Sequence, residues 1–145
     1  MFKRRPRPQP KVVRTDAEWQ ASLDPEAYRV LRRSGTESPG SSPYVHPPTN
    51  PDGVYRCAGC DAELFREQDQ FDSGTGWPSF SDSASSDAVH VRTDFKLVLP
   101  RREVTCANCG GHLGHVFGDG PAPSGQRWCI NGAALTIDGR ARDNR

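Results

Sequence analysis

The sequence lacks any long hydrophobic run. No apolar segment approaches the roughly 20 residues of a membrane-spanning helix. The basic N-terminus is also not followed by the apolar stretch of a secretory signal. We therefore expect a cytoplasmic protein without a membrane partner.

An excess of charge of one sign is also missing. Lys and Arg number 19 against 18 Asp and Glu, which gives a net charge of +1. Such a balance provides no bulk attraction to a phosphate backbone, so we expect no nucleic-acid partner. Hydrophobic residues are scarce at 34%, whereas 14 Gly and 13 Pro indicate many loops and a small core.

The domain organisation is simple. Residues 1–14 are Pro-rich and basic and cannot pack a core, so we expect a flexible tail. A targeting role for this tail is the less favoured alternative. The remaining residues, 15–145, have the length of a single domain, which we expect to act as a monomer.

Two short helices are predicted after the tail. Thr15 and Glu18 have the spacing of a capping box, in which each side chain binds a free backbone amide at the start of a helix. This helix should end near Leu23. A second helix should begin with Asp24 as its N-cap and end at Gly35.

The rest of the chain is typical of a mainly β protein. Six Pro and Gly residues between positions 36 and 53 exclude a regular element there and predict a wrapping loop. After this loop come short β-like runs that are joined by turns. They indicate an antiparallel β domain with the helices packed outside it. The runs cover residues 54–57, 88–92, 95–99, 103–106, 115–117, 127–130 and 134–137.

Four of the five cysteines form two Cys-x-x-Cys pairs. The first pair is Cys57 and Cys60, and the second is Cys106 and Cys109. Four thiolates complete a tetrahedral zinc site with no open position, so we expect one structural zinc per chain. A redox dithiol would leave the other pair unexplained; rubredoxin-like iron is the chemical alternative. The long separation of the pairs predicts that the metal joins distant parts of one domain.

Cys129 is the fifth cysteine. An isolated cysteine on a strand is more often an inert core residue, but Arg127, Asn131 and a histidine could stabilise its thiolate. His112 and His115 follow the second cysteine pair directly. A second metal site on these histidines is disfavoured because four thiolates are already available.

Trp77 lies in a segment, residues 71–80, that mixes turn residues with aromatic ones. The Pro after it restricts its backbone. From composition alone, Trp77 is as well explained by a core position as by a binding surface.

Several sequence blocks resemble the signatures of B-type methionine-sulfoxide reductases. They are YRCAGCDAELF, FDSGTGWPSF, EVTCANCGGHLGHVF and RWCINGAAL, in that family's order, and the helical segment ending in SGTE is also similar. The resemblance implies a β-tent of two antiparallel sheets with a remote structural zinc. It also implies reduction of the R epimer of methionine sulfoxide, chiefly in proteins.

The same resemblance assigns roles to residues. Cys129 matches the nucleophile, whose attack on the sulfoxide leaves a sulfenic acid. Trp77 matches the wall that receives the substrate methyl group. The other matching residues are Phe117 and Thr75 around the substrate, His112 and His115 at the sulfoxide oxygen, and Arg127 and Asn131 in support.

Thr75 departs from the pattern of many family members, which carry a recycling cysteine there. With the other cysteines committed to metal, we expect a one-cysteine enzyme, reduced by thioredoxin, glutaredoxin or a small thiol. One alternative is a zinc-ribbon binding module in which Cys129 is only core, although no basic face supports it. Another is a thiol-dependent enzyme of the same fold with a different oxidised or sulfur substrate.

Overall fold

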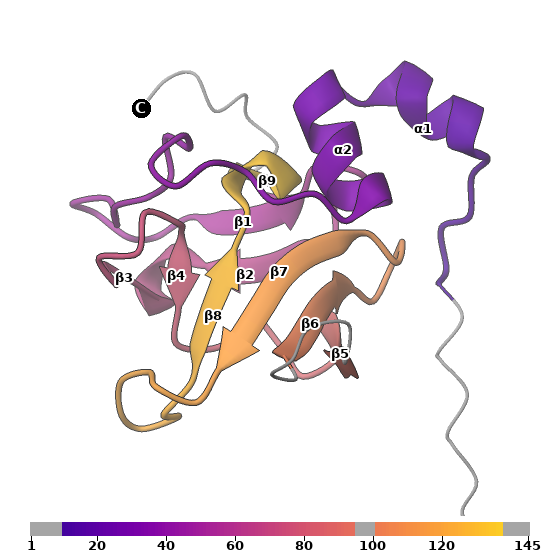
Figure 1. The fold of residues 1–145 in the computed structure, drawn as a ribbon. Helices are drawn as coiled ribbons and strands as arrows, with labels where there is room; N and C mark the ends of the chain where they lie inside the picture. Colours follow the sequence, from indigo (N-terminus) through magenta and orange to yellow (C-terminus); the bar gives the residue numbers. More distant parts are fainter. Residues whose placement is uncertain (1–9, 95–100, 138–145) are drawn as a thin grey trace, which may run out of the picture.

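The computed structural model describes residues 10–94 and 101–137 of the chain (Figure 1). The strand expected over residues 95–99 lies outside these ranges. In chain order the elements are α1 (Asp16–Ser22), α2 (Pro25–Arg33), β1 (Val54–Cys57), β2 (Glu63–Arg66), η1 (Glu67–Asp69), β3 (Gln70–Phe71), β4 (Ser79–Phe80), β5 (Val89–Asp94), β6 (Arg101–Cys106), β7 (His112–Phe117), β8 (Arg127–Ile130), η2 (Gly132–Ala134) and β9 (Leu135–Ile137).

Both helices begin where their capping residues predict. The hydroxyl of Thr15 accepts a hydrogen bond from the amide of Glu18, and the Glu18 carboxylate accepts one from the Thr15 amide. Asp24 caps α2 by accepting a hydrogen bond of 2.8 Å from the Ala27 amide. These side chains satisfy amides that would otherwise lack partners, which explains the predicted helix starts.

The end of α2 differs from the prediction by one residue. Ser34, not Gly35, takes the left-handed conformation, with φ of 54°. Gly35 is needed for another reason. A Cβ at Gly35 would lie 2.7 Å from the guanidinium of Arg29 and 3.0 Å from the carbonyl oxygen of Arg29. Glycine therefore allows the chain to pass close to Arg29 at the end of the helix.

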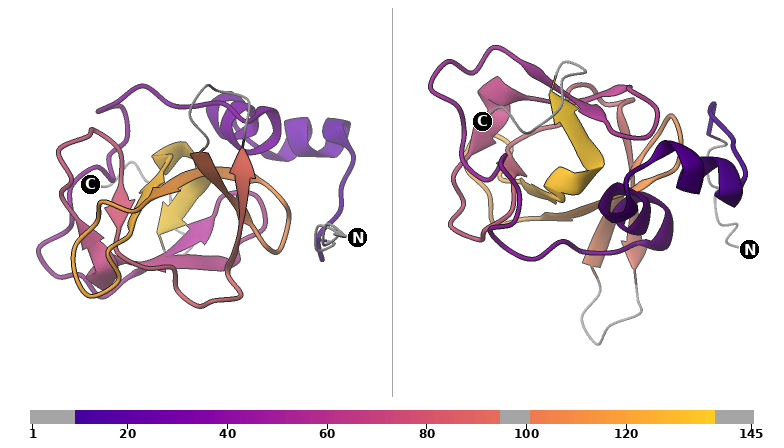
Figure 2. Two further views of the ribbon diagram at one scale, coloured as in Figure 1. Left: turned by 60° about the horizontal axis from the view of Figure 1, so that its bottom comes forward. Right: turned by 90° about the horizontal axis from the view of Figure 1, so that it is seen from above.

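Two antiparallel sheets make up the body of the protein. The smaller has the strand order β2-β1-β9, and the larger has the order β3-β4-β8-β7-β6-β5. The helices lie together on one side of the sheets (Figure 2), where α2 contacts β7 and η2. The prediction of a mainly β fold with two sheets and short N-terminal helices is confirmed.

The core lies between the sheets and is strongly aromatic. Phe65 of β2 stacks on Phe80 of β4 with ring centroids 4.6 Å apart, and Tyr55 of β1 meets Phe80 edge-on at 5.3 Å. Trp128 of β8 lies 6.1 Å from Phe65. These rings join the two sheets. They stabilise the contact through the apolar area that they bury and through their stacked and edge-to-face arrangement.

The chain between the helices and β1 wraps around the sheets without a regular element, as its Pro and Gly content predicts. The amide of Gly40 donates a hydrogen bond of 2.7 Å to the carbonyl of Gly76, which joins this loop to the β3–β4 connection. Neither helix of the described ranges has the length and apolar character to cross a bilayer.

Candidate functional site

The two Cys-x-x-Cys pairs converge on one point. Cys57 is the last residue of β1 and Cys60 lies in the turn after it, while Cys106 is the last residue of β6 and Cys109 lies in the turn before β7. All four sulfurs lie within 4.8 Å of one another, with Sγ pairs at 3.7 and 3.6 Å. Tetrahedral zinc with bonds of about 2.3 Å separates its sulfurs by about 3.8 Å. The quartet therefore fits a tetrathiolate metal site.

The electrostatics of the quartet also call for a cation. Hydrogen bonds from neighbouring thiols hold the pKa of Cys60 and Cys109 below the ordinary thiol range, whereas those same contacts raise the pKa of Cys57 and Cys106. Ionisation of some of the four thiols thus disfavours ionisation of the others. A divalent metal ion removes this conflict because it stabilises four thiolates at once.

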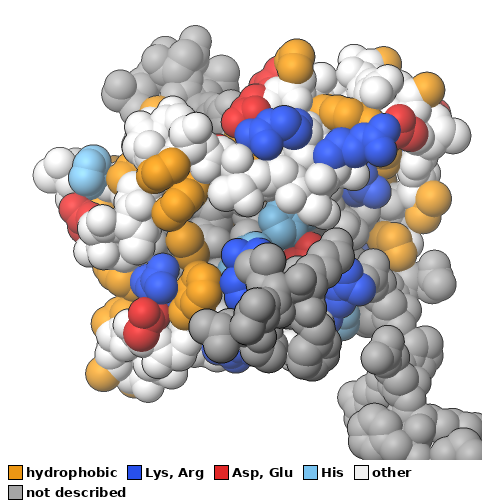
Figure 3. Space-filling view, in the orientation of Figure 1, with side chains coloured by type: hydrophobic (Ala, Val, Ile, Leu, Met, Phe, Trp, Pro, Cys, Tyr) orange, Lys and Arg blue, Asp and Glu red, His pale blue; other side chains and the backbone are white. Residues whose placement is uncertain are grey.

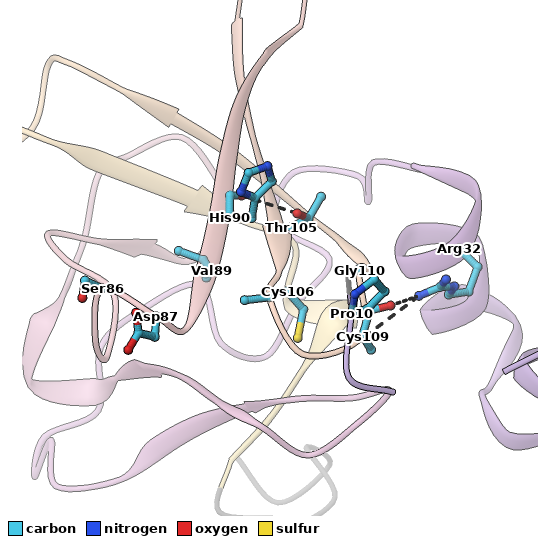
Figure 4. Close-up of a pocket in the computed structure, with 11 residues that line it drawn as sticks. Pro10, Arg32, Ser86, Asp87, Val89, His90, Thr105, Cys106, Cys109 and Gly110 are labelled. Atoms are coloured by element: carbon cyan, nitrogen blue, oxygen red, sulfur yellow. Dashed lines mark hydrogen bonds between the residues drawn. The ribbon is translucent and has the colours of Figure 1, made fainter. Parts of the chain in front are cut away.

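A cavity of about 490 Å³ borders the metal site (Figure 4). Arg32 of α2 points at its edge and donates a hydrogen bond of 3.0 Å to the carbonyl of Cys109. Val12, within the segment expected to be a tail, donates its amide to Asn108 at 2.8 Å. The helices and the N-terminal segment thus support the turn that carries the second cysteine pair.

Cys129 lies in a row of residues that crosses the six-stranded sheet. On β7, His115 is directly opposite Cys129, and on β4, Ser79 is directly opposite it. Residues in direct opposition on antiparallel strands point to the same face. We call this set the cross-strand row; from β3 to β5 it consists of Phe71, Ser79, Cys129, His115, Glu103 and Arg92.

A β-bulge brings the second histidine to the same face. Residues three apart on a regular strand point in opposite directions. Here Val104 of β6 is opposite Gly114 and Thr105 is opposite His112, so β7 carries an extra residue between them. The rings of His112 and His115 therefore meet edge-on, with centroids 5.5 Å apart.

A small cavity of about 120 Å³ opens at Cys129. It is lined by Thr36, Trp77, Arg101, Gly114, His115, Phe117, Cys129 and Asn131. The structure thus brings together five of the eight residues assigned to the site. Figure 3 shows a patch of histidine surface near basic and acidic side chains in the middle of the face drawn.

His112 lies behind the cavity. Its Nδ1 is 2.7 Å from a carboxylate oxygen of Glu103, and the other oxygen of Glu103 accepts a hydrogen bond of 3.0 Å from Arg92. His112 is 5% exposed, so among the two histidines only His115 borders the open cavity. The two histidines therefore have different surroundings, which the sequence did not predict.

Arg127 and Thr75 flank Cys129 without lining the cavity. The guanidinium of Arg127 forms two hydrogen bonds with Asp119, at 2.9 and 3.2 Å, and stacks over the ring of Phe117 at 4.5 Å. Burial raises the pKa of Cys129 above its ordinary value, while the charge of Arg127 and a hydrogen bond with Thr75 act to lower it. The cysteine is therefore held as a thiol at rest near neutral pH.

Glu37 is a site residue that sequence reasoning missed. Its carboxylate, 3% exposed, accepts hydrogen bonds of 2.9 Å from the amides of Gly132 and Ala133. Its backbone amide donates to the side chain of Asn131, and its carbonyl accepts from the indole of Trp77. The only available signal was the SGTE block of the resemblance, since a loop glutamate has no periodic pattern.

Comparison with known proteins gives a consistent result. The SelR domain model matches residues 23–139. The chain is 47% identical to peptide methionine sulfoxide reductase MsrB of Agrobacterium fabrum over 89% of this chain and 94% of that protein. It is 50% identical to MsrB of Methanosarcina barkeri over 89% of each chain.

A mouse relative matches over part of its length. Mitochondrial methionine-R-sulfoxide reductase B3 of Mus musculus is 43% identical over 88% of this chain and 49% of that protein. The family match covers most of the chain, and it includes both cysteine pairs and every residue of the cavity. The chain belongs to the SelR-domain family of MsrB-type peptide methionine sulfoxide reductases.

Proposed function

We propose that this enzyme reduces the R epimer of methionine sulfoxide, chiefly in oxidised proteins and peptides, with Cys129 as the nucleophile. The observation that carries the proposal is the opposition of Cys129 and His115 across two strands, at a small cavity with aromatic walls. The name of the mouse relative supports the choice of epimer.

The cavity suits the end of a methionine sulfoxide side chain. Trp77 and Phe117 present aromatic surface that can hold the methyl group, and the polar side is formed by His115 and Asn131. The indole of Trp77 is fixed by its hydrogen bond of 3.0 Å to Glu37. Because the apolar and polar sides differ, only one arrangement of methyl group and oxygen matches both, which selects one epimer.

The chemistry requires a nucleophile and a proton. Sulfoxide sulfur becomes electrophilic when its oxygen is hydrogen-bonded or protonated. Burial keeps Cys129 as a thiol at rest, so its own proton can pass by way of His115 to the sulfoxide oxygen. The Cys129 sulfur then takes the oxygen with its proton. The thiol and the sulfoxide become a sulfenic acid and methionine, with atoms and electrons balanced.

His112 supports this step from behind. Its Nδ1 is held by the carboxylate of Glu103, which fixes the ring orientation against His115. We assign His115 to the substrate oxygen and His112 to positioning. Arg127 supports the site through its charge near Cys129. Asn131 supports it through the hydrogen bond that its side chain accepts from the Glu37 amide.

The sulfenic acid must then be reduced by an external thiol. The sequence has five cysteines, and four of them form the metal site. Two external thiols reduce the sulfenic acid back to the thiol of Cys129. They become joined in a disulfide, and the oxygen of the sulfenic acid leaves as one water molecule. Thioredoxin, glutaredoxin or a small thiol can supply them.

We further propose that the metal is zinc and structural. Cys57, Cys60, Cys106 and Cys109 would supply all four ligands, and none of them lines the cavity at Cys129. Zinc at a closed thiolate site contributes to folding stability. Elemental analysis of the purified protein distinguishes zinc from iron.

The decisive experiment measures reduction of the two epimers of a peptide methionine sulfoxide with dithiothreitol. Wild-type protein should reduce the R epimer only, and Cys129→Ser should lose turnover. His115→Gln should reduce kcat by about 100-fold or more, whereas His46→Gln, at an exposed histidine paired with Asp72, should not. Equal rates on both epimers, or activity in Cys129→Ser, would contradict the proposal.

A further inference from the structure

Arg101 lines the cavity at Cys129 and has no role in the reaction proposed above. It is the first residue of β6, two positions before Glu103, which is directly opposite His115 in the cross-strand row. Because side chains alternate along a strand, Arg101 and Glu103 project from the same face of the sheet. The pairing of β6 with β7 continues toward Phe117, another residue of the cavity wall. Strand register and cavity lining thus agree on the position of Arg101.

The side chain of Arg101 is without a partner in the described part of the chain. Its Nε is buried and forms no hydrogen bond. Within residues 10–94 and 101–137, no carboxylate forms an ion pair with its guanidinium. Buried donors almost always have partners in native proteins, so an unsatisfied one at a cavity calls for an explanation.

The acidic groups around the cavity already have partners of their own. Asp119 binds Arg127, and Glu103 binds Arg92 and a histidine. The carboxylate of Glu37 is occupied by two backbone amides. None of these three carboxylates neutralises Arg101. A carboxylate that enters from outside would therefore meet a cation that is not already paired.

The size of the cavity shows which part of a substrate can reach Arg101. A volume of about 120 Å³ is small beside the several hundred Å³ of an ordinary ligand pocket, so it suits the end of one side chain. The residues on either side of the oxidised methionine must then lie at the rim. The sulfoxide itself carries no net charge, and its oxygen is assigned to His115. A charged partner for Arg101 must come from the flanking part of the substrate.

We infer that Arg101 is a specificity-determining residue that binds a carboxylate of the substrate next to the oxidised methionine. A guanidinium matches a carboxylate through two parallel hydrogen bonds, which fix direction as well as charge. The carboxylate belongs either to an acidic side chain beside the methionine or to the C-terminus of the substrate. The inference rests on the proposed function, because it requires the sulfoxide side chain to occupy the cavity.

The test compares peptides that differ in a single charge. The full-length, metal-loaded enzyme is given blocked peptides in which Glu or Gln precedes the methionine R-sulfoxide, and others in which Glu or Gln follows it. A third pair ends in methionine R-sulfoxide as the free acid or as the amide. The carboxylate member should have a kcat/KM higher by about 5- to 10-fold in at least one pair. The pair that shows the preference identifies the source of the carboxylate.

Variants assign the preference to Arg101. Arg101→Gln should abolish it, Arg101→Lys should keep part of it, and Arg101→Glu should favour a peptide with Lys in place of Glu. Arg102→Gln is the matched control. It removes the neighbouring positive charge on the opposite face of β6, so the wild-type preference should remain. Added salt should weaken the preference in the wild type, because the ion pair lies at a rim open to solvent.

Two results would overturn the inference. The first is an equal kcat/KM within all three pairs in the wild type, a comparison that needs no variant to fold. The second is an equal loss of kcat/KM on every peptide in Arg101→Gln, which would place the guanidinium on a group common to all of them.

Failure of the proposed function would look different. In that case the wild type would reduce none of the peptides, or Cys129→Ser would reduce them. Calorimetry measures the Kd of the same peptides for Cys129→Ser and reports the carboxylate preference without any turnover. A lower Kd for the carboxylate member, lost in Cys129→Ser/Arg101→Gln, is the expected result, and equal Kd values in all pairs would contradict the role of Arg101.

Discussion

His112 and Glu103 form a buried pair in which Nδ1 of the imidazole lies 2.7 Å from a carboxylate oxygen. A carboxylate can only accept, so Nδ1 carries the proton and Nε2 is left as the other ring atom available for hydrogen bonding. The same carboxylate binds Arg92. Glu103 therefore fixes both the tautomer and the orientation of the histidine behind the active site.

Replacement of Glu103 should cost stability. Glu103→Gln removes the charge that holds both His112 and Arg92, so the free energy of unfolding should fall by about 1–3 kcal/mol. Urea denaturation measures the change. Glu63→Gln is the control, because Glu63 is an exposed residue paired with Arg56 at 3.5 Å, and its loss should cost less than about 1 kcal/mol. Equal losses of unfolding free energy in the two variants would show that the buried pair stabilises the protein no more than the exposed pair does.

The same pair predicts an acid-dependent loss of stability. Burial acts to raise the pKa of Glu103, but hydrogen bonds from His112 and Arg92 outweigh it and hold the pKa below its ordinary value of 4.5. A depressed pKa stabilises the fold above the ordinary value, and this contribution is lost as pH falls through the folded-state pKa. The difference in stability between wild type and Glu103→Gln should therefore be larger at about pH 6 than at about pH 3. A difference independent of pH would contradict this origin.

Glu37 should be required for both stability and activity. Glu37→Gln weakens the hydrogen bonds to Gly132 and Ala133 and disturbs the segment that holds Asn131 and Trp77. We expect a loss of about 2 kcal/mol in unfolding free energy and a lower kcat/KM. Thermal melting and steady-state kinetics measure the two effects. Glu26→Gln, at an exposed glutamate bound to Arg29, should change neither.

Removal of the metal should destabilise the whole domain. The four cysteines join the turn after β1 to the β6–β7 turn, so their loss separates two distant parts of the chain. A chelator should lower the melting temperature by on the order of 10 °C or more. Cys129→Ser should keep a full equivalent of metal, whereas Cys109→Ser should not. Metal-independent melting would contradict the structural role.

A cysteine at position 75 should convert the enzyme to internal recycling. Thr75 is close enough to Cys129 to lower the pKa of its thiol, so the thiol of Thr75→Cys should have the sulfenic acid within reach. After one turnover without reductant, mass spectrometry should find a disulfide between the two residues. Thr93→Cys, on exposed β5, should form none. Absence of the disulfide in Thr75→Cys would contradict this prediction.

Features with a local cause were predicted well from the sequence. The bounds of β1 and β8 agree residue for residue, because alternating apolar residues end at clear turn signals. The starts of both helices follow from side chains three residues from the amides that they bind. The metal quartet was also foreseeable, since each Cys-x-x-Cys turn directs two sulfurs to one side.

Features that depend on distant contacts were not predicted. Strands β3 and β4 have two residues each, too few for any periodic pattern, and β2 was missed as well. The bulge in β7 arises from pairing with β6, so the sequence could not show that one histidine faces the cavity and the other faces Glu103. The position of Glu37 is set by a loop that returns to η2.

The cross-strand row makes correct strand pairing a condition for activity. Side chains alternate along a strand, so a shift of β8 against β7 by a single residue would turn Cys129 to the opposite face of the sheet from His115. A chain misfolded in this way could keep its sheet content and its metal while losing all turnover. Sulfoxide reduction per bound metal ion is thus a stringent assay of native folding, more so than circular dichroism or metal content alone.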